Sequence, residues 1–271
     1  MTLTVLSDNR AYDSSLETEH GLSFLLETGG KKILLDTGAS DVFMRNAAYL
    51  GKDLRDVNYV FLSHGHKDHT GGLERFLTEV PGAQVIVSPY SVGGCFCSSR
   101  KGMHDISTEW PLEMMEGRVV AVEGNMDVDG MHVIADIRMT HALPKADRCL
   151  YVKESEGCTY SSDDFRHEIA LYVDGLLFTG CAHKGILNIL DSCRFPVKTV
   201  AGGFHLLDSA SDGEDFESSQ ELVEIASELI GRYPQVTYYT GHCTGDDAYE
   251  TMRTVMGDRL RKFSCGMCLE I

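Results

Sequence analysis

The stretch Ser63-His64-Gly65-His66-Lys67-Asp68-His69-Thr70-Gly71-Gly72 places three imidazoles and one carboxylate close together in the chain. It directly follows an apolar run, residues 59–62, which predicts a buried strand. Imidazole and carboxylate groups are the natural protein ligands of zinc, iron and manganese. Because a tight turn at a strand end lets alternate side chains converge, we expect His64 and His66 to hold one metal ion. Asp68 and His69 then face a neighbouring ion.

Three later segments share one layout, in which an apolar run is followed by small residues and then by a histidine. A single histidine of this kind is more often a core or loop residue that binds no metal. Three of them beside the first motif indicate a shared cleft, because ligands from separate segments meet where strand ends line one edge of a sheet. The side chains at these positions are Cys181 with His183, His205, and His242.

The apolar pattern elsewhere alternates between strand-like and helix-like segments. Gly29 and Gly30 separate two apolar runs and predict a hairpin over residues 22–36. Residues 220–232 have the apolar spacing of an amphipathic helix. Sheets covered by helices, in one α/β domain over residues 1–271, are therefore expected. Residues 89–117 are rich in Gly, Ser and Cys, and predict either a lid or substrate loop or a surface excursion with its own small core.

Charge and composition limit the possible partners. The chain has 24 Lys and Arg against 41 Asp and Glu, a formal net charge of −17. Such a surface repels phosphodiester backbones, so we expect a small-molecule substrate and no nucleic acid. No run of about 18 apolar residues occurs, and the first residues lack the pattern of a secretory signal. We therefore expect a cytoplasmic protein that does not bind membranes, and nothing in the sequence indicates its oligomeric state.

The nine cysteines predict free thiols or metal ligands rather than a disulfide framework. Cys265 and Cys268 have the spacing of half a zinc site or of a redox dithiol. A closed structural zinc site needs four ligands, and no second pair with this spacing exists in the sequence. Free thiols are therefore the expected state of this pair.

Four motifs together resemble those of the metallo-β-lactamase superfamily. They are Leu35-Asp36-Thr37-Gly38, His64-x-His66-x-Asp68-His69, Thr179-Gly180-Cys181 and Gly241-His242. The residues around Cys181, His205 and His242 are similar to one subgroup, that of the archaeal synthase joining a dihydropterin to ribofuranosylaminobenzene phosphate in methanopterin biosynthesis. The resemblance covers most of the chain and implies an αββα sandwich of the metallo-β-lactamase type. It also implies two divalent metal ions at one edge of the sheets, with zinc expected first and manganese or iron as alternatives.

The resemblance also implies individual ligands. The first ion is expected on His64 and His66, and the second on Asp68, His69 and His242. Behind the site, Asp36 is expected to orient ligands through hydrogen bonds.

The sequence departs from the common pattern of the superfamily at two places. Cys181 stands where a bridging aspartate is usual, and the usual Gly-His-Thr motif before it is absent. Either His183 supplies the missing imidazole while Cys181 contacts the second ion, or His167 supplies it and His183 contacts the substrate. A further alternative is that Cys181 is a thiol that only packs in the core and binds no metal. His205 is expected to contact the substrate, as a phosphate-binding donor or a general acid.

These ligands predict a dinuclear metal-dependent hydrolase acting on a small anionic ester or phosphoester. Two divalent ions lower the pKa of a bridging water and generate hydroxide at neutral pH, with Asp68 holding the nucleophile and moving its proton. An alternative is a transferase or synthase that uses the same ions on a pterin pyrophosphate. A di-iron redox protein is a further alternative, disfavoured because related iron proteins usually carry a glutamate at the position of His66. A metal-binding protein without catalytic activity is the last alternative.

Overall fold

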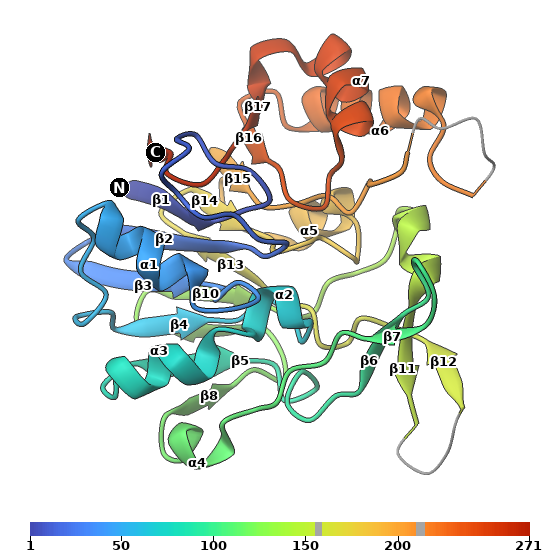
Figure 1. Ribbon diagram of the computed structural model, residues 1–271. Helices are drawn as coiled ribbons and strands as arrows, with labels where there is room; N and C mark the ends of the chain where they lie inside the picture. The colour runs from blue at the N-terminus through green and yellow to red at the C-terminus, as the bar shows by residue number, and fades with distance from the viewer. Residues whose placement is uncertain (155–158, 210–214) are drawn as a thin grey trace.

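Two sheets of seven strands form the centre of the fold (Figure 1). The computed structural model describes residues 1–154, 159–209 and 215–271. Sheet I runs in the order β18 (Cys268–Glu270), β1 (Thr2–Ser7), β2 (Ser23–Thr28), β3 (Lys31–Leu35), β4 (Tyr59–Phe61), β5 (Gln84–Val87) and β8 (Val119–Ala121). Sheet II runs in the order β17 (Leu260–Lys262), β16 (Thr237–Thr240), β15 (Thr199–Ala201), β14 (Leu176–Phe178), β13 (Ala170–Val173), β10 (Met131–Ile134) and β9 (Met126–Val128). The predicted hairpin is confirmed as the antiparallel pair of β2 and β3.

Helices cover the outer faces of both sheets. The helices packed on sheet I are α1 (Val42–Tyr49) and α3 (Leu73–Glu79), and those on sheet II are α5 (Ile186–Ser192), α6 (Ser219–Arg232) and α7 (Asp246–Met256). The shorter helices are α2 (Lys67–Thr70), α4 (Leu112–Met115), η1 (Lys145–Cys149) and η2 (Gly257–Arg259). Between the sheets, the Phe178 ring meets the edges of Phe24 and Phe61 at centroid distances of 5.8 and 6.1 Å. The layers are therefore αββα, as the sequence predicts.

A third, small sheet lies beside the two large ones (Figure 1). Its strands are β12 (Tyr160–Ser162), β11 (Leu150–Lys153), β6 (Phe96–Ser98) and β7 (His104–Asp105), in that order. Because β6 pairs with β11, the segment 89–117 is not a self-contained excursion. It is tied to residues 150–162 instead, and its role as a lid or substrate loop stays a prediction.

The direction of the strands brings the chemistry-bearing residues to one edge. In sheet I, β3 and β4 are parallel, and β1 runs in the same direction because both it and β3 are antiparallel to β2. In sheet II, β14, β15 and β16 are parallel. The residues that follow these strands make sharp turns, since positive φ angles of 57°, 56°, 49° and 49° occur at Asp36, Ala182, His205 and His242. Such backbone strain concentrates at functional sites.

The described cysteines are all free thiols, in agreement with the sequence. Cys265 is buried, where its sulfur lies 3.1 Å from the Leu6 carbonyl oxygen and accepts a hydrogen bond from Asn46 Nδ2 at 3.1 Å. Cys268 is exposed at an edge strand, and Cys158 lies outside the described residues. Among the residues described, no helix has the length and apolarity to cross a membrane.

Helix α6 offers a test of the fold that does not touch the site. Gly231 is exposed near its C-terminal end, and a Cβ at this position would meet no atom within 4 Å. Gly231→Ala should therefore raise the free energy of unfolding by about 0.5–1 kcal/mol, because alanine loses less backbone entropy in a helix. Thermal and urea unfolding would measure the gain. Gly245→Ala is the control and should destabilise, since Gly245 has φ of 81° and its Cβ would lie 3.0 Å from Leu207 Cα.

Candidate metal centre

Three buried imidazoles converge at the shared edge of the sheets. The ligand atoms of His64, His66 and His183 lie within 4.8 Å of one another. The Nε2 atom of each has no hydrogen-bond partner among the residues described. A buried polar atom without a partner costs about 1–3 kcal/mol. A cation bound between the three nitrogens would remove this cost, so the donor set fits a metal ion.

Hydrogen bonds to Nδ1 set the tautomers of two of these imidazoles, His64 and His183. His64 Nδ1 donates to Ser63 Oγ at 2.9 Å, and Ser63 Oγ donates to Asp36 Oδ2 at 2.7 Å. His183 Nδ1 donates to Asp147 Oδ1 at 2.8 Å. The lone pair of each ring therefore lies on Nε2, which faces the centre. Burial, with the neighbouring imidazoles, lowers the pKa of His64 and His183 well below the usual value, which favours the neutral form that binds metals.

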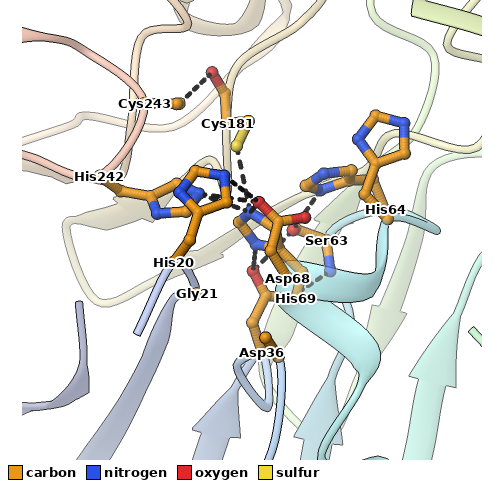
Figure 2. Close-up of polar contacts among 12 residues, drawn as sticks. His20, Gly21, Asp36, Ser63, His64, Asp68, His69, Cys181, His242 and Cys243 are labelled. Carbon is orange, nitrogen blue, oxygen red and sulfur yellow. Dashed lines mark hydrogen bonds and ion pairs between the residues drawn. The ribbon is translucent and has the colours of Figure 1, made fainter. Parts of the chain in front are cut away.

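A second group of ligands lies beside His64, a member of the first group (Figure 2). His69 Nε2 is 3.2 Å from His242 Nε2 and 3.1 Å from Cys181 Sγ. Asp68 Oδ2 is 3.2 Å from His242 Nε2. His69 Nδ1 donates to Asp36 Oδ2 at 2.6 Å and His242 Nδ1 donates to Asn9 Oδ1 at 3.1 Å, so both rings turn their Nε2 atoms toward each other. Two imidazole nitrogens, a carboxylate oxygen and a thiol sulfur that converge in this way fit a bound cation.

The two groups of ligands share one supporting carboxylate, Asp36. It is completely buried, and its Oδ1 accepts from the backbone N–H of Ser63 at 2.7 Å. Its Oδ2 accepts from Ser63 Oγ and from His69 Nδ1. Asp36 thus orients His69 directly and His64 through Ser63, in the place behind the site that the resemblance implies.

The surroundings of His167 and His183 distinguish the two alternatives for the third imidazole. His167 Nδ1 accepts from the backbone N–H of Gly65 at 3.0 Å, and its Nε2 donates to Asp163 Oδ2 at 3.0 Å. Both of its nitrogens are engaged, whereas His183 Nε2 has no partner among the described residues. The geometry therefore favours His183 as the ligand.

The turn that carries His183 is held by a buried carboxylate. Glu168 accepts hydrogen bonds from the backbone N–H groups of His183 at 2.6 Å and Lys184 at 2.7 Å. Burial raises the pKa of Glu168 to about 7. Glu168 thereby supports the positive φ at Ala182 and fixes the direction in which His183 leaves the backbone.

Cys181 faces both groups of ligands. Its sulfur lies within 4.8 Å of the ligand atoms of His64 and His69, and also belongs to a group with His242 and Cys243. The side chain is 2% exposed. A thiolate is a normal zinc or iron ligand, so the position of Cys181 fits a ligand between two ions.

His205 lies beside the first group. Its Nδ1 is 2.8 Å from Asp147 Oδ1, the same oxygen that accepts from His183, and the two rings are 4.3 Å apart. Burial lowers the pKa of His205, but the Asp147 carboxylate raises it, and the result lies above the usual value. A protonated imidazole at this place could donate a hydrogen bond or a proton to a bound substrate.

Sequence reasoning missed several residues of the centre. His20 Nε2 lies 3.4 Å from Asp68 Oδ2, and its ring stacks on His242 at 4.9 Å. Asp8 Oδ1 accepts from the backbone N–H of His242 at 3.1 Å. Asp8 and Asn9 follow strand β1 as Asp36 follows β3, so the strand-end pattern could have identified them. Asp147 and His20 carry no such signal, because neither follows an apolar strand.

Comparisons with known proteins concern the family and the fold. The family model described as the metallo-beta-lactamase superfamily matches residues 16–95. The crystal structure of Tm1679, a metal-dependent hydrolase of the β-lactamase superfamily, is 27% identical with a TM-score of 0.80, covering 100% of this chain and 99% of that one. A diphosphatase of the PhnP family, 14% identical with a TM-score of 0.52, covers 100% of this chain and 97% of its own, and shows the fold alone.

Two archaeal proteins of Methanocaldococcus jannaschii also align along most of the chain. One is 7,8-dihydropterin-6-methyl-4-(beta-D-ribofuranosyl)-aminobenzene-5'-phosphate synthase, 27% identical in an alignment of 266 residues that covers 89% of this chain and 86% of the synthase. The other, an uncharacterized protein, is 27% identical over 213 residues, or 76% of this chain and 79% of its own length. The chain thus has the metallo-β-lactamase fold, its residues 16–95 match the model of that superfamily, and along most of its length it resembles the archaeal dihydropterin synthase.

Proposed function

We propose that the protein is a dinuclear metal-dependent hydrolase whose substrate is a small anionic ester or phosphoester. The observation that carries the proposal is the convergence of buried imidazole nitrogens with no partner among the described residues. His64, His66 and His183 would hold one ion. The remaining ligands, Asp68, His69 and His242, would hold the other, with Cys181 between the two.

Two bound divalent ions would supply Lewis-acid activation of water and of the electrophilic centre of the substrate. The protein's own side chains would position the attacking water and would donate a proton to the leaving group. Asp68 is part-exposed, and its Oδ2 is 3.2 Å from His242 Nε2 and 3.4 Å from His20 Nε2, so it can accept a proton from an attacking water. His205, held by Asp147, can donate to the leaving group on the side of the first ligand group.

The metal content and one variant test the hydrolase. Protein purified without air should contain about two equivalents of zinc, manganese or iron by elemental analysis. His66→Ala should abolish turnover in a panel of phosphoesters, lactones and carboxylic esters, because one ligand of the first group is lost. The matched control is His104→Ala, since His104 is an exposed histidine of β7 outside the centre.

Circular dichroism and melting temperature would show that both variants fold. Turnover retained by metal-free His66→Ala, or a wild-type protein with no metal after reconstitution, would contradict the hydrolase.

A transferase or synthase acting on a pterin pyrophosphate is the second candidate. It is favoured by the alignment with the archaeal synthase, which spans 89% of this chain. Hydrolysis and condensation at a pyrophosphate ester need the same positioned groups and differ in the acceptor. Incubation with a pterin pyrophosphate and an aromatic amine distinguishes the two, since a coupled product indicates the synthase and a free alcohol the hydrolase.

A further inference from the structure

Arg100 lies in the segment 89–117 and is tied to the part of the chain that carries the candidate site. The backbone N–H of Ser99 donates to the Cys149 carbonyl at 2.8 Å, and Cys149 lies two residues after Asp147. On the other side, Arg100 Nη1 donates to Asp208 Oδ2 at 2.7 Å, three residues after His205. Since Asp147 and His205 are themselves 2.8 Å apart, these contacts tie Arg100 to both of the segments that carry them.

The guanidinium of Arg100 is only partly satisfied. Its side chain is 23% exposed, and Phe216 lies under it with 5.8 Å between Cζ and the ring centroid. Nη1 is used by Asp208, but Nη2 is buried and has no hydrogen-bond partner among the residues described. A buried cationic donor without an acceptor is costly, and an anionic oxygen is the group that completes it.

The overall charge of the protein favours an additional local cation where an anionic substrate would bind. With a formal net charge of −17, the chain as a whole repels anions. A local cation beside the centre would offset this repulsion where the substrate binds. Arginine suits this task because its guanidinium stays charged and forms charge-assisted hydrogen bonds with oxyanions, here through the Nη2 that Asp208 does not use.

We propose that Arg100 forms an oxyanion subsite next to the metal centre, which binds a phosphate or carboxylate group of the substrate while the reacting bond lies at the ions. The inference rests on the proposed function and deepens it, since it assigns the negative charge of the substrate to one residue. It also gives the segment 89–117 a role in binding the substrate.

Calorimetric titration of the metal-loaded protein with inorganic phosphate, pyrophosphate and malonate tests the subsite. Arg100→Ala should weaken the binding of the preferred anion roughly 10- to 100-fold, because a charge-assisted hydrogen bond is lost. Arg100→Lys keeps the charge without the fork and should show an intermediate loss. The preference between phosphate, pyrophosphate and malonate identifies the oxyanion class.

Arg75→Ala is the matched control. Arg75 is an exposed arginine of α3 whose Nη2 pairs with Glu79 Oε1, so its removal changes the net charge equally, away from the centre. Equal anion affinity in wild type and Arg100→Ala, or an equal loss in Arg75→Ala, would overturn the subsite. A loss of metal or of melting temperature in Arg100→Ala would also overturn it, because Arg100 would then be structural.

Absence of anion binding in the metal-loaded wild type would overturn the subsite alone. Failure of the hydrolase itself is recognised separately, from metal content and the turnover of His66→Ala.

Discussion

Replacing His183 with alanine is expected to lower the metal content from about two equivalents to about one and to remove most of the catalytic turnover. His183 Nε2 points to the same place as the Nε2 atoms of His64 and His66, and none of the three has a partner among the described residues. With two imidazoles left, the first ion would be held too weakly to survive purification. Removing a residue that only hydrogen-bonds to a metal ligand typically lowers metal affinity about 10- to 100-fold. Removing a ligand itself should therefore lower it more than about 100-fold.

His167→Ala is the matched control for this experiment. His167 is as buried as His183 and lies near the same ligands, but its nitrogens bond to Gly65 and Asp163. Its removal should lower the melting temperature while the metal content stays at the wild-type value. The opposite result, with metal lost from His167→Ala and kept by His183→Ala, would show that His167 is the ligand.

Replacing Asp36 with alanine is expected to reduce both stability and metal content. The carboxylate accepts three hydrogen bonds in a fully buried place, two from Ser63 and one from His69. Without it, three donors would remain buried and unpaired, at a cost of about 3–5 kcal/mol. This is a large share of the roughly 5–15 kcal/mol that stabilises a typical domain. Urea unfolding and elemental analysis measure the two effects.

Two further variants keep this result interpretable. Asp56→Ala removes an exposed carboxylate paired with Lys32 at 2.7 Å and should change stability little. Asp36→Asn keeps an acceptor for the Ser63 backbone N–H but turns an N–H₂ group toward Ser63 Oγ or His69 Nδ1. If Asp36→Ala does not fold, Asp36→Asn should still fold with reduced metal content. Wild-type stability and metal content in both Asp36 variants would contradict the supporting role.

The αββα layers were expected from the resemblance to the superfamily, while local patterns alone predicted sheets covered by helices. Apolar runs at strand spacing and amphipathic runs at helical spacing indicated most of the two sheets and the helices on them. The small third sheet was not predicted, because β6, β7, β11 and β12 are short, and β7 and β12 are exposed. Their pairing joins segments about fifty residues apart, and no local pattern specifies such a partner.

By itself, the sequence indicated a resemblance to the superfamily, the αββα layers that this resemblance implies, and the set of side chains able to bind metal, because motifs are local properties of the chain. It left open whether His167 or His183 faces the centre, and it did not reveal Asp147 or Arg100. The tertiary structure favours His183, since both nitrogens of His167 form hydrogen bonds whereas His183 Nε2 forms none with the described residues. These contacts depend on Asp147 and Asp163, which the fold places beside His183 and His167.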